Sequence, residues 1–137
     1  MILLDTNVVL DSLIKRKLFY QEADIILNLA VEKKIECCIS ANSLADIFYF
    51  CSKEKNVPEA RYMLNYLLEN FEVAAIDGED CKSAMKLPIA DFEDALIVQC
   101  ALKYKVEYII TRDIKLHTNG VVTAVSPEEF LNEMQGN

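Results

Sequence analysis

The feature that most constrains the fold is an alternation along the chain between short apolar segments and longer segments with helical periodicity. The apolar segments are typical of strands in a buried sheet. Strands separated by helices pair in parallel, because each helix returns the chain to the same edge through a right-handed crossover. The alternation therefore predicts an α/β/α sandwich, with a central parallel sheet of four or five strands flanked by helices.

The boundaries of these segments follow from apolar periodicity and from capping residues. Strands are expected at Ile2–Leu4, Glu36–Ile39, Val73–Ile76, Tyr108–Thr111 and Val121–Ala124. Helices are expected over 7–14, 20–33, 42–53, 58–70, 79–86 and 91–104, with a last one starting in SPEEF at 126–130. In SPEEF, Ser126 is the expected cap, Pro127 the first helical residue and Glu129 the residue that reaches back. A length of 137 residues without repeats favours a single domain, 1–137.

Composition narrows the class of protein. Apolar residues make up 53% of the chain, yet no apolar run approaches the ~20 residues of a membrane helix. We expect no signal peptide, and hence a soluble, cytoplasmic protein without membrane contact. A net charge of −8 argues against tight non-specific nucleic-acid binding, which needs many basic residues. It does not argue against a nuclease, because a metal site is itself acidic, and an acidic surface also suits a basic protein partner.

The cysteines give no sign of a zinc site or a disulfide framework. They number five, lack CxxC spacing and are accompanied by a single histidine. We interpret them as small buried apolar residues of a protein in a reducing compartment. Their positions are 37, 38, 51, 81 and 100.

Three carboxylates occupy positions where a parallel sheet presents its ligands. Asp5 ends the first strand, Asp113 follows the fourth, and Asp94 lies in the first turn of the helix expected over 91–104. Ligands of such sheets bind beyond the carboxyl ends of the strands. Clustered carboxylates repel unless a cation neutralises them, and oxygen ligands alone suit Mg²⁺ or Mn²⁺.

Each of these residues also has a simpler interpretation. Asp5 has the position of a helix cap, Asp91 and Asp94 those of a cap and its partner, and Asp113 that of a turn residue. Asp46 lies off the apolar stripe of its helix, so periodicity permits either a cleft-facing or a solvent-facing side chain. The residues alone leave these alternatives open.

Four stretches, in this order along the chain, resemble the PIN-domain family of ribonucleases, which includes the VapC-type toxins. They are LLDTNVVLD, ISANSLADI, DFEDALIVQCA and YIITRD, and the closing TAVSPEEFL is similar to a subgroup whose third block reads DFED. The resemblance covers essentially the whole chain. It implies the same fold as the alternation of segments, a parallel sheet flanked by helices.

The resemblance also implies a metal site and its residues. Asp5, Asp46, Asp94 and Asp113 correspond to the family's ligands of divalent metal, here Mg²⁺ or Mn²⁺. Asn7 and Thr111 resemble the polar residues that support the cluster, and Asp91 the extra acid of the DFED subgroup. The chain departs from the family in two places. Asp46 is shorter than the usual Glu, and Leu116 and His117 stand where an Asp-Phe pair is common.

The resulting hypothesis is an endoribonuclease that hydrolyses RNA phosphodiester bonds with a carboxylate-bound metal, as the toxin of a toxin–antitoxin pair. The family further implies a homodimer and an antitoxin partner. Candidate phosphate contacts are Lys15, Arg16, Lys17 and Arg112. The alternative is a catalytically degenerate PIN-like domain that acts as a binding module. A haloacid-dehalogenase-type phosphatase is disfavoured, because its second Asp would stand at position 7, which is Asn.

Overall fold

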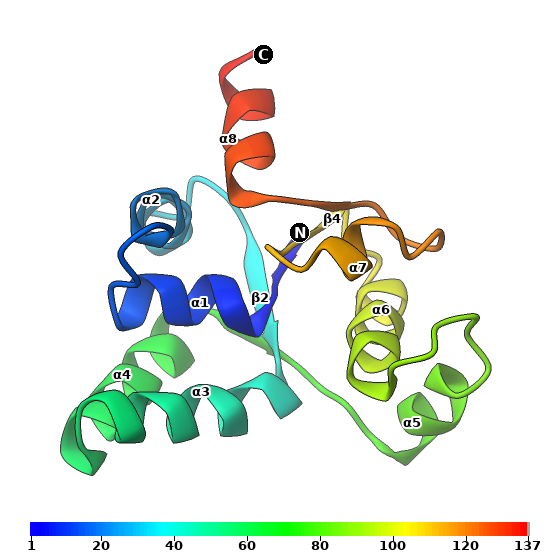
Figure 1. Cartoon of the computed structure of the whole chain (residues 1–137), viewed down its shortest axis with the longest axis horizontal. Coiled ribbons are helices and arrows are strands. Elements are labelled where there is room, and N and C mark those ends of the chain that lie inside the picture. The colour runs from blue at the N-terminus through cyan, green and yellow to red at the C-terminus, as the bar shows by residue number, and fades with distance from the viewer. Residues whose placement is uncertain (137) are drawn as a thin grey trace.

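The computed structural model describes residues 1–136, in which helices alternate with short strands (Figure 1). The strands are β1 (Ile2–Leu4), β2 (Cys37–Ser40), β3 (Glu72–Ala74), β4 (Tyr108–Ile110) and β5 (Ala124–Val125). The helices are α1 (Thr6–Leu13), α2 (Tyr20–Val31), α3 (Ala41–Glu54), α4 (Val57–Asn70), α5 (Gly78–Ala84), α6 (Phe92–Tyr104), α7 (Ile114–His117) and α8 (Pro127–Gln135). The predicted single domain extends to residue 137, which lies outside the described residues.

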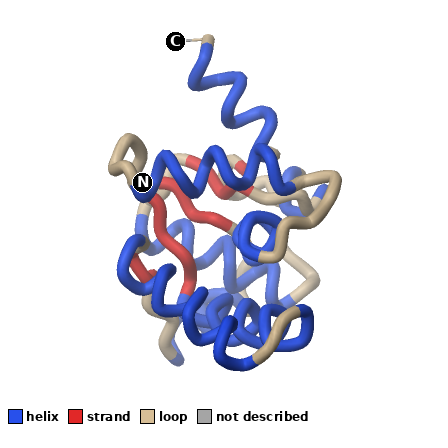
Figure 2. Tube along the Cα trace, turned by 90° about the vertical axis from the view of Figure 1, so that its left-hand side faces the viewer, coloured by secondary structure: helices blue, strands red, loops and turns tan. Residues whose placement is uncertain are grey.

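The five strands form one parallel sheet in the order β3-β2-β1-β4-β5, which confirms the predicted fold class. The chain builds outward from β1 through β2 to β3, and then returns to the other side of β1 to add β4 and β5. Strand order therefore reverses between β1 and β4, and such a switch point opens a crevice at the carboxyl ends of the two strands. Figure 2 shows the strands enclosed among the helices.

The sheet separates two apolar layers, because successive side chains of a strand point to opposite faces. From β1, Leu4 belongs to the larger cluster and Leu3 to the smaller one. The larger cluster includes side chains of α1, α2, α3, α4 and α8, and the smaller one side chains of α6 and α7. Figure 1 shows α1 to α4 on one side of the sheet and α5 to α7 on the other. Burial of both faces is what makes the strands continuously apolar.

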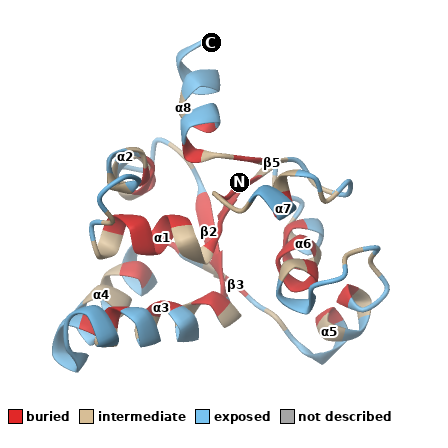
Figure 3. Ribbon diagram, in the orientation of Figure 1, coloured by how far each residue is buried: buried red, intermediate tan, exposed pale blue. Residues whose placement is uncertain are grey.

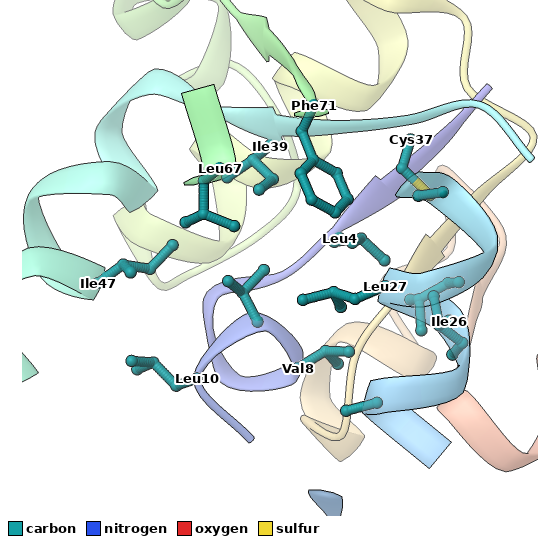
Figure 4. Close-up of a cluster of buried hydrophobic side chains, with 14 of the residues drawn as sticks. Leu4, Val8, Leu10, Ile26, Leu27, Cys37, Ile39, Ile47, Leu67 and Phe71 are labelled. Carbon is teal, nitrogen blue, oxygen red and sulfur yellow. The ribbon is translucent and has the colours of Figure 1, made fainter. Parts of the chain in front are cut away.

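Side chains from distant parts of the chain meet in the larger cluster (Figure 4). Leu4 of β1 is drawn beside Leu27 of α2, and Ile39 of β2 beside Leu67 of α4; all four belong to this cluster and are almost completely buried. Along α3 and α4, buried residues such as Ile47 and Leu67 alternate with exposed ones, as the colouring of Figure 3 shows. This packing fixes α1, and with it the residues at its amino end, against β1.

Four of the five cysteines are buried, as predicted, and Cys81 is partly exposed; all five are free thiols. Burial raises the pKa of Cys37 and of Cys38 to about 12, and that of Cys100 to about 11. These thiols therefore stay protonated and act as small apolar groups. The reducing compartment stays a prediction.

Four strands differ from their expected bounds: β2 by one residue at each end, β4 by one residue at one end, and β3 and β5 by more. β5 begins at Ala124, because the Asn119 carboxamide accepts the amide hydrogens of Val121 and Val122 and folds this segment into a turn. β3 ends at Ala74, since the amide of Ala75 donates instead to the Tyr104 hydroxyl at 2.7 Å. Both side-chain contacts compete with the sheet for backbone donors.

The capping residues predicted for α8 are confirmed, whereas α3 has no side-chain cap. Ser126 and Glu129 form the predicted capping box of α8, with Pro127 at its start. Ser40 precedes α3, but its hydroxyl is hydrogen-bonded to the Ser43 hydroxyl at 2.8 Å rather than to the helix backbone. The short helix α7 was not expected from the sequence. Among residues 1–136, no helix has the length and apolarity needed to cross a membrane.

The core packing predicts a sharp contrast between two neighbouring isoleucines of α2. Ile26 is 0% exposed and Ile25 is 50% exposed. Ile26→Ala should lower the free energy of unfolding by about 2–5 kcal/mol, because it leaves a cavity that the core cannot refill. Ile25→Ala should change it by about 0.5 kcal/mol or less. Urea unfolding of both variants measures the difference, and equal losses would contradict the assigned face of α2.

Candidate active site

Asp5 lies at the point where β1 ends and α1 begins, and its carboxylate is almost completely buried. Oδ1 accepts the amide hydrogen of Thr6 at 2.8 Å, so Asp5 is the cap of α1. Oδ2 accepts the Thr111 hydroxyl at 2.7 Å and the Asn7 carboxamide at 3.3 Å. Asp5 is thus both a helix cap and part of a polar cluster. Three donors fix the orientation of its carboxylate.

Thr111 and Asn7 connect the ends of β1 and β4, which are neighbouring strands. Asn7 donates to the Thr111 hydroxyl at 3.3 Å and accepts the amide hydrogen of Arg112 at 3.2 Å. Thr111 is completely buried and also accepts the amide hydrogen of Asp113 at 3.0 Å. Both residues therefore bind the Asp5 carboxylate, and the role in supporting a metal cluster that the family resemblance implied for them stays a prediction.

Asp113 begins α7 and caps it, since its Oδ1 accepts the amide hydrogen of Lys115 at 3.0 Å. Leu116 is buried in the smaller apolar cluster. His117 places Nε2 2.7 Å from the carbonyl oxygen of Thr111. The residues that replace the family's Asp-Phe pair thus hold α7 against the sheet.

Asp94 projects from the first turn of α6. Its amide donates to Oδ1 of Asp91 at 3.0 Å, so Asp91 is the cap of this helix. Asp94 is partly buried, whereas Asp91 is exposed. The capping role expected of Asp91 is confirmed. Asp94 keeps a free carboxylate, since no side-chain capping bond to the Asp91 amide accompanies this cap in the described structure.

A pocket of about 330 Å³ brings the predicted aspartates together at the switch point. Asp5, Asp94 and Asp113 line it with Asp46, whose side chain on α3 therefore faces the pocket. Asp91 and Thr111 are not among its lining residues. The remaining lining residues are Thr6, Asn7, Leu10, Arg16, Asn42, Ser43, Phe50, Glu93 and Ile97.

The carboxylates of this acidic pocket influence one another. Burial raises the pKa of Asp5 above its usual 3.8 and the negative charge of Asp113 raises it further, while hydrogen bonds from Thr111 and Thr6 oppose the shift. Burial raises the pKa of Asp94 as well, with further increases from the charges of Asp91, Asp113 and Asp5, opposed by Lys115. Ionisation of each group therefore carries an energetic cost. A cation would remove that cost.

The donor set of the acidic pocket suits a hard divalent cation. Its lining contains carboxylate, carboxamide and hydroxyl oxygens but neither histidine nor cysteine. Asn42 contributes a carboxamide oxygen, Oδ1, that is buried and accepts no hydrogen bond within the described chain. The carboxylates do not yet converge, because residues 1–136 contain no group of three acidic, histidine or cysteine side chains close enough to hold an ion. Residues and chemistry fit a metal, and ligation would draw these like charges closer together.

The four predicted phosphate contacts separate into different environments. Arg16 lines the acidic pocket. Lys15 forms an ion pair with Asp24 at 2.7 Å, and Lys17 is exposed outside the pocket lining. Arg112 turns its guanidinium away from the pocket toward α1, where it binds Asp11. The structure therefore places only Arg16 of the four beside the aspartates.

Four polar residues near the site were not singled out from the sequence. Asn42, Ser43 and Glu93 line the acidic pocket, and Asp11 is a completely buried carboxylate one turn along α1 from Asn7. Asn42 and Glu93 stand in motifs that were recognised, ISANSLADI and DFED, so proximity to those motifs was an available signal. Asp11 carried the same signal, since it ends the recognised stretch LLDTNVVLD, and it is also a charged residue among apolar neighbours, VVLDSL.

The profile of the PIN domain matches residues 1–115 of the chain. The chain belongs to the PIN-domain family. Membership in the DFED subgroup of this family stays a prediction. No curated protein sequence is significantly similar to the chain.

Solved structures share this PIN fold at low sequence identity. VapBC2 from Rickettsia felis, bound to a DNA fragment from its promoter, is 20% identical, with a TM-score of 0.68 over 92% of this chain and 98% of that one. A toxin–antitoxin complex from Klebsiella pneumoniae is 22% identical, with a TM-score of 0.69 over 93% and 98%. VapC20 from Mycobacterium tuberculosis, a toxin that cleaves the sarcin–ricin loop, is 15% identical, with a TM-score of 0.71 over 89% and 97%.

The raised pKa of Asp5 predicts how its neutral analogue changes stability in metal-free protein. Asp5→Asn removes the titrating group, but it also places an amide where the carboxylate accepts hydrogen bonds from Thr111 and Asn7, so the informative quantity is the pH dependence of the stability difference. The native state binds a proton at Asp5 more tightly than the unfolded chain does, so wild type gains stability as pH falls from the raised pKa toward 3.8. Urea unfolding in EDTA should therefore show the free energy of unfolding of wild type rising relative to that of the variant over that interval. A fall of wild type relative to the variant on acidification would contradict this.

Proposed function

We propose that the chain is a metal-dependent endoribonuclease that hydrolyses RNA phosphodiester bonds and is the toxin of a toxin–antitoxin pair. The observation that supports this most strongly is that four aspartates line one pocket. Asp5, Asp46, Asp94 and Asp113 come from four separate segments and line the same cavity. Capping explains Asp5 and Asp113 individually, but it does not explain why all four aspartates line one pocket at the switch point of a PIN fold.

The proposed metal is Mg²⁺ or Mn²⁺. Asp5, Asp94 and Asp113 are the proposed direct ligands, and Asp46, which is more exposed, completes the set. When bound, such an ion polarises a phosphoryl oxygen and lowers the pKa of a water molecule. No histidine or lysine lines the pocket to act as a base among the described residues, so activation of the nucleophile is a role for the ion.

The protein's own residues hold this site in place. Thr111, Asn7 and the Thr6 amide orient the Asp5 carboxylate, and three fixed donors limit its rotation. Arg16 brings the single positive charge among the lining residues, which suits a contact with the RNA phosphate. Phe50 lines the same pocket and is partly exposed, which suits contact with a sugar or base.

Partners are proposed from the neighbouring structures and from charge. Several solved neighbours are toxins in complex with antitoxins, and a pocket rich in carboxylates complements a basic segment of an inhibitor. An antitoxin that inserts a cationic side chain there would block metal and RNA together. We further propose that the protein is a homodimer and is located in the cytoplasm. Tyr49 and Phe50 are exposed side by side on α3 and are available for contacts with a second subunit or an antitoxin.

The function is tested by substituting one aspartate of the pocket. Asp94→Asn should lower the Mn²⁺-dependent cleavage of single-stranded RNA by about a hundredfold or more, because an ion of this kind contributes several kcal/mol to the transition state. A matched control is Asp77→Asn, which replaces the exposed cap of α5 with an equally good cap far from the pocket. Gel assays with and without EDTA measure both variants, and circular dichroism checks their folding.

Three outcomes would count against the proposal. Cleavage that survives EDTA, or that Asp94→Asn leaves intact, would show that the aspartates do not hold a catalytic metal. Folded wild type that neither cleaves RNA nor gains thermal stability from Mn²⁺ would favour the degenerate PIN-like domain, since a ligand of the native state must stabilise it.

The charge that binds the RNA backbone is tested by comparing two neighbouring residues. Arg16→Gln should weaken RNA binding and reduce the slope of log affinity against log salt by about 0.7, the effect of losing one contact to a single strand. Lys17→Gln, outside the pocket lining, should leave the slope nearly unchanged. Fluorescence anisotropy in the presence of Mn²⁺ with a cleavage-resistant RNA probe keeps the aspartates of the pocket intact during the comparison. Equal slopes for the two variants would remove Arg16 from the proposed site.

A further inference from the structure

We propose that Asp11 and Arg112 form a positioning pair that fixes Asp113 relative to Asp5 before metal or RNA binds. The inference rests on the proposed metal-dependent function. It assigns a role to two residues whose side chains lie behind the acidic pocket, since neither is among the residues that line it. The pair is not itself catalytic; it acts through the backbone between Thr111 and Asp113.

Asp11 is a buried carboxylate with both oxygens bound. Its side chain is 0% exposed. Nε of Arg112 donates to Oδ2 at 2.6 Å, and Nη2 donates to Oδ1 at 3.0 Å, so the pair is bidentate. Arg16 adds a weaker contact, 3.5 Å from Oδ1. A buried carboxylate is tolerated only with such pairing, and the planar guanidinium fixes direction as well as distance.

Three groups hold residue 112 from different sides. Asn7 and Asp11 are four residues apart on α1 and so lie on one face of the helix. Asn7 accepts the backbone amide of Arg112 at 3.2 Å, while Asp11 binds its side chain. The ring of Phe19 covers the guanidinium, with Cζ 3.8 Å from the ring centroid. We call Arg112, Asn7, Asp11 and Phe19 the Arg112 cluster.

The Arg112 cluster opposes a repulsion inside the acidic pocket. Asp5 begins α1 and Asp113 directly follows Arg112, and their like charges favour separation when no cation is present. The segment that carries Asp113 leaves the sheet at Thr111, so it could swing away from α1 to relieve this repulsion. Arg112 ties the segment to the same helix that Asp5 caps. The Arg112 cluster therefore keeps Asp113 at a fixed position relative to Asp5 before a metal ion binds to them.

A second buried ion pair offers a matched control. Lys103 of α6 donates to Asp80 of α5 at 2.8 Å, and the Asp80 side chain is only 7% exposed. This pair also joins two elements and stabilises the fold, but neither residue lines the acidic pocket. If the role of Arg112 is only to stabilise the fold, Lys103→Gln and Arg112→Lys should behave alike.

The experiment compares Arg112→Lys, Asp11→Asn, the double variant and Lys103→Gln. Lysine keeps the charge of residue 112 but cannot reproduce the bidentate geometry. In metal-free protein, hydrogen–deuterium exchange of residues 111–117 should rise in the first three variants and stay at the wild-type level in Lys103→Gln. Calorimetric titration with Mn²⁺ should show a loss of affinity of roughly tenfold for Arg112→Lys, the scale seen for residues that orient metal ligands.

The double variant tests whether the two residues act as one unit. If they do, Asp11→Asn combined with Arg112→Lys should lose no more Mn²⁺ affinity than the worse single variant. Should Asp11→Asn fail to fold, Phe19→Leu replaces it, because it removes the ring and leaves the ion pair. A smaller affinity loss in the same direction is then expected.

Two results would overturn the positioning role. One is Mn²⁺ affinity in Arg112→Lys equal to that of Lys103→Gln, and the other is unchanged exchange of residues 111–117. Failure of the proposed function looks different, since wild type itself would then bind no Mn²⁺. In that case the exchange comparison, made without metal, still decides whether the Arg112 cluster fixes the Asp113 segment.

Discussion

The hydrogen bond from the Thr111 hydroxyl to Asp5 joins the carboxyl ends of β1 and β4, and the arrangement of the site depends on it. Both groups are buried, so neither has water as an alternative partner, and loss of this bond would leave a charge unsatisfied. The bond is possible because β1 and β4 are adjacent and in register, with Leu4 opposite Ile110. The sheet thus places position 111 beside position 5, although 106 residues separate them in sequence.

Helix capping explains how the fold tolerates so many carboxylates in one place. Asp5 and Asp91 cap α1 and α6, so the amide donors and positive ends of these helices offset part of the negative charge. A cap uses only one oxygen of a carboxylate, and the other oxygen of Asp5 accepts hydrogen bonds from Thr111 and Asn7. In DTN, the cap and the proposed metal ligand are therefore one residue, Asp5, and the two interpretations are compatible. In DFED they are different residues, because Asp91 is the cap and Asp94, which forms no reciprocal capping bond, is the proposed ligand.

The sequence predicted elements and local chemistry better than long-range contacts. Apolar periodicity located the strands to within a few residues, and the capping box of Ser126 and Glu129 marked α8 correctly. The beginning of β5 depended on Asn119, whose side chain takes two backbone amides, and this choice between turn and strand is not visible in apolar periodicity. α7 escaped prediction because four residues carry too little periodicity to mark a helix.

The candidate site shows the same division. Strand ends and the family resemblance pointed to Asp5, Asp94 and Asp113, and the structure places them around one pocket. Periodicity left open which way Asp46 points, and the packing of α3 places it at the acidic pocket, where it remains exposed. Asp11 could not be paired from sequence, since Arg112 is 101 residues away and the strand order decides that they meet.

The net charge of −8 limits how this protein can bind RNA, which is itself a polyanion. Lys15, Arg16 and Arg112 already form ion pairs with carboxylates, so they add little free positive charge. Arg16 is the one basic residue among the described residues that line the acidic pocket, and one arginine cannot hold a polyanion against a cluster of aspartates. The attraction for phosphate must therefore come from the same aspartates once a cation neutralises them. Binding of RNA and binding of metal are then coupled, because each needs the other to offset the charge of the pocket.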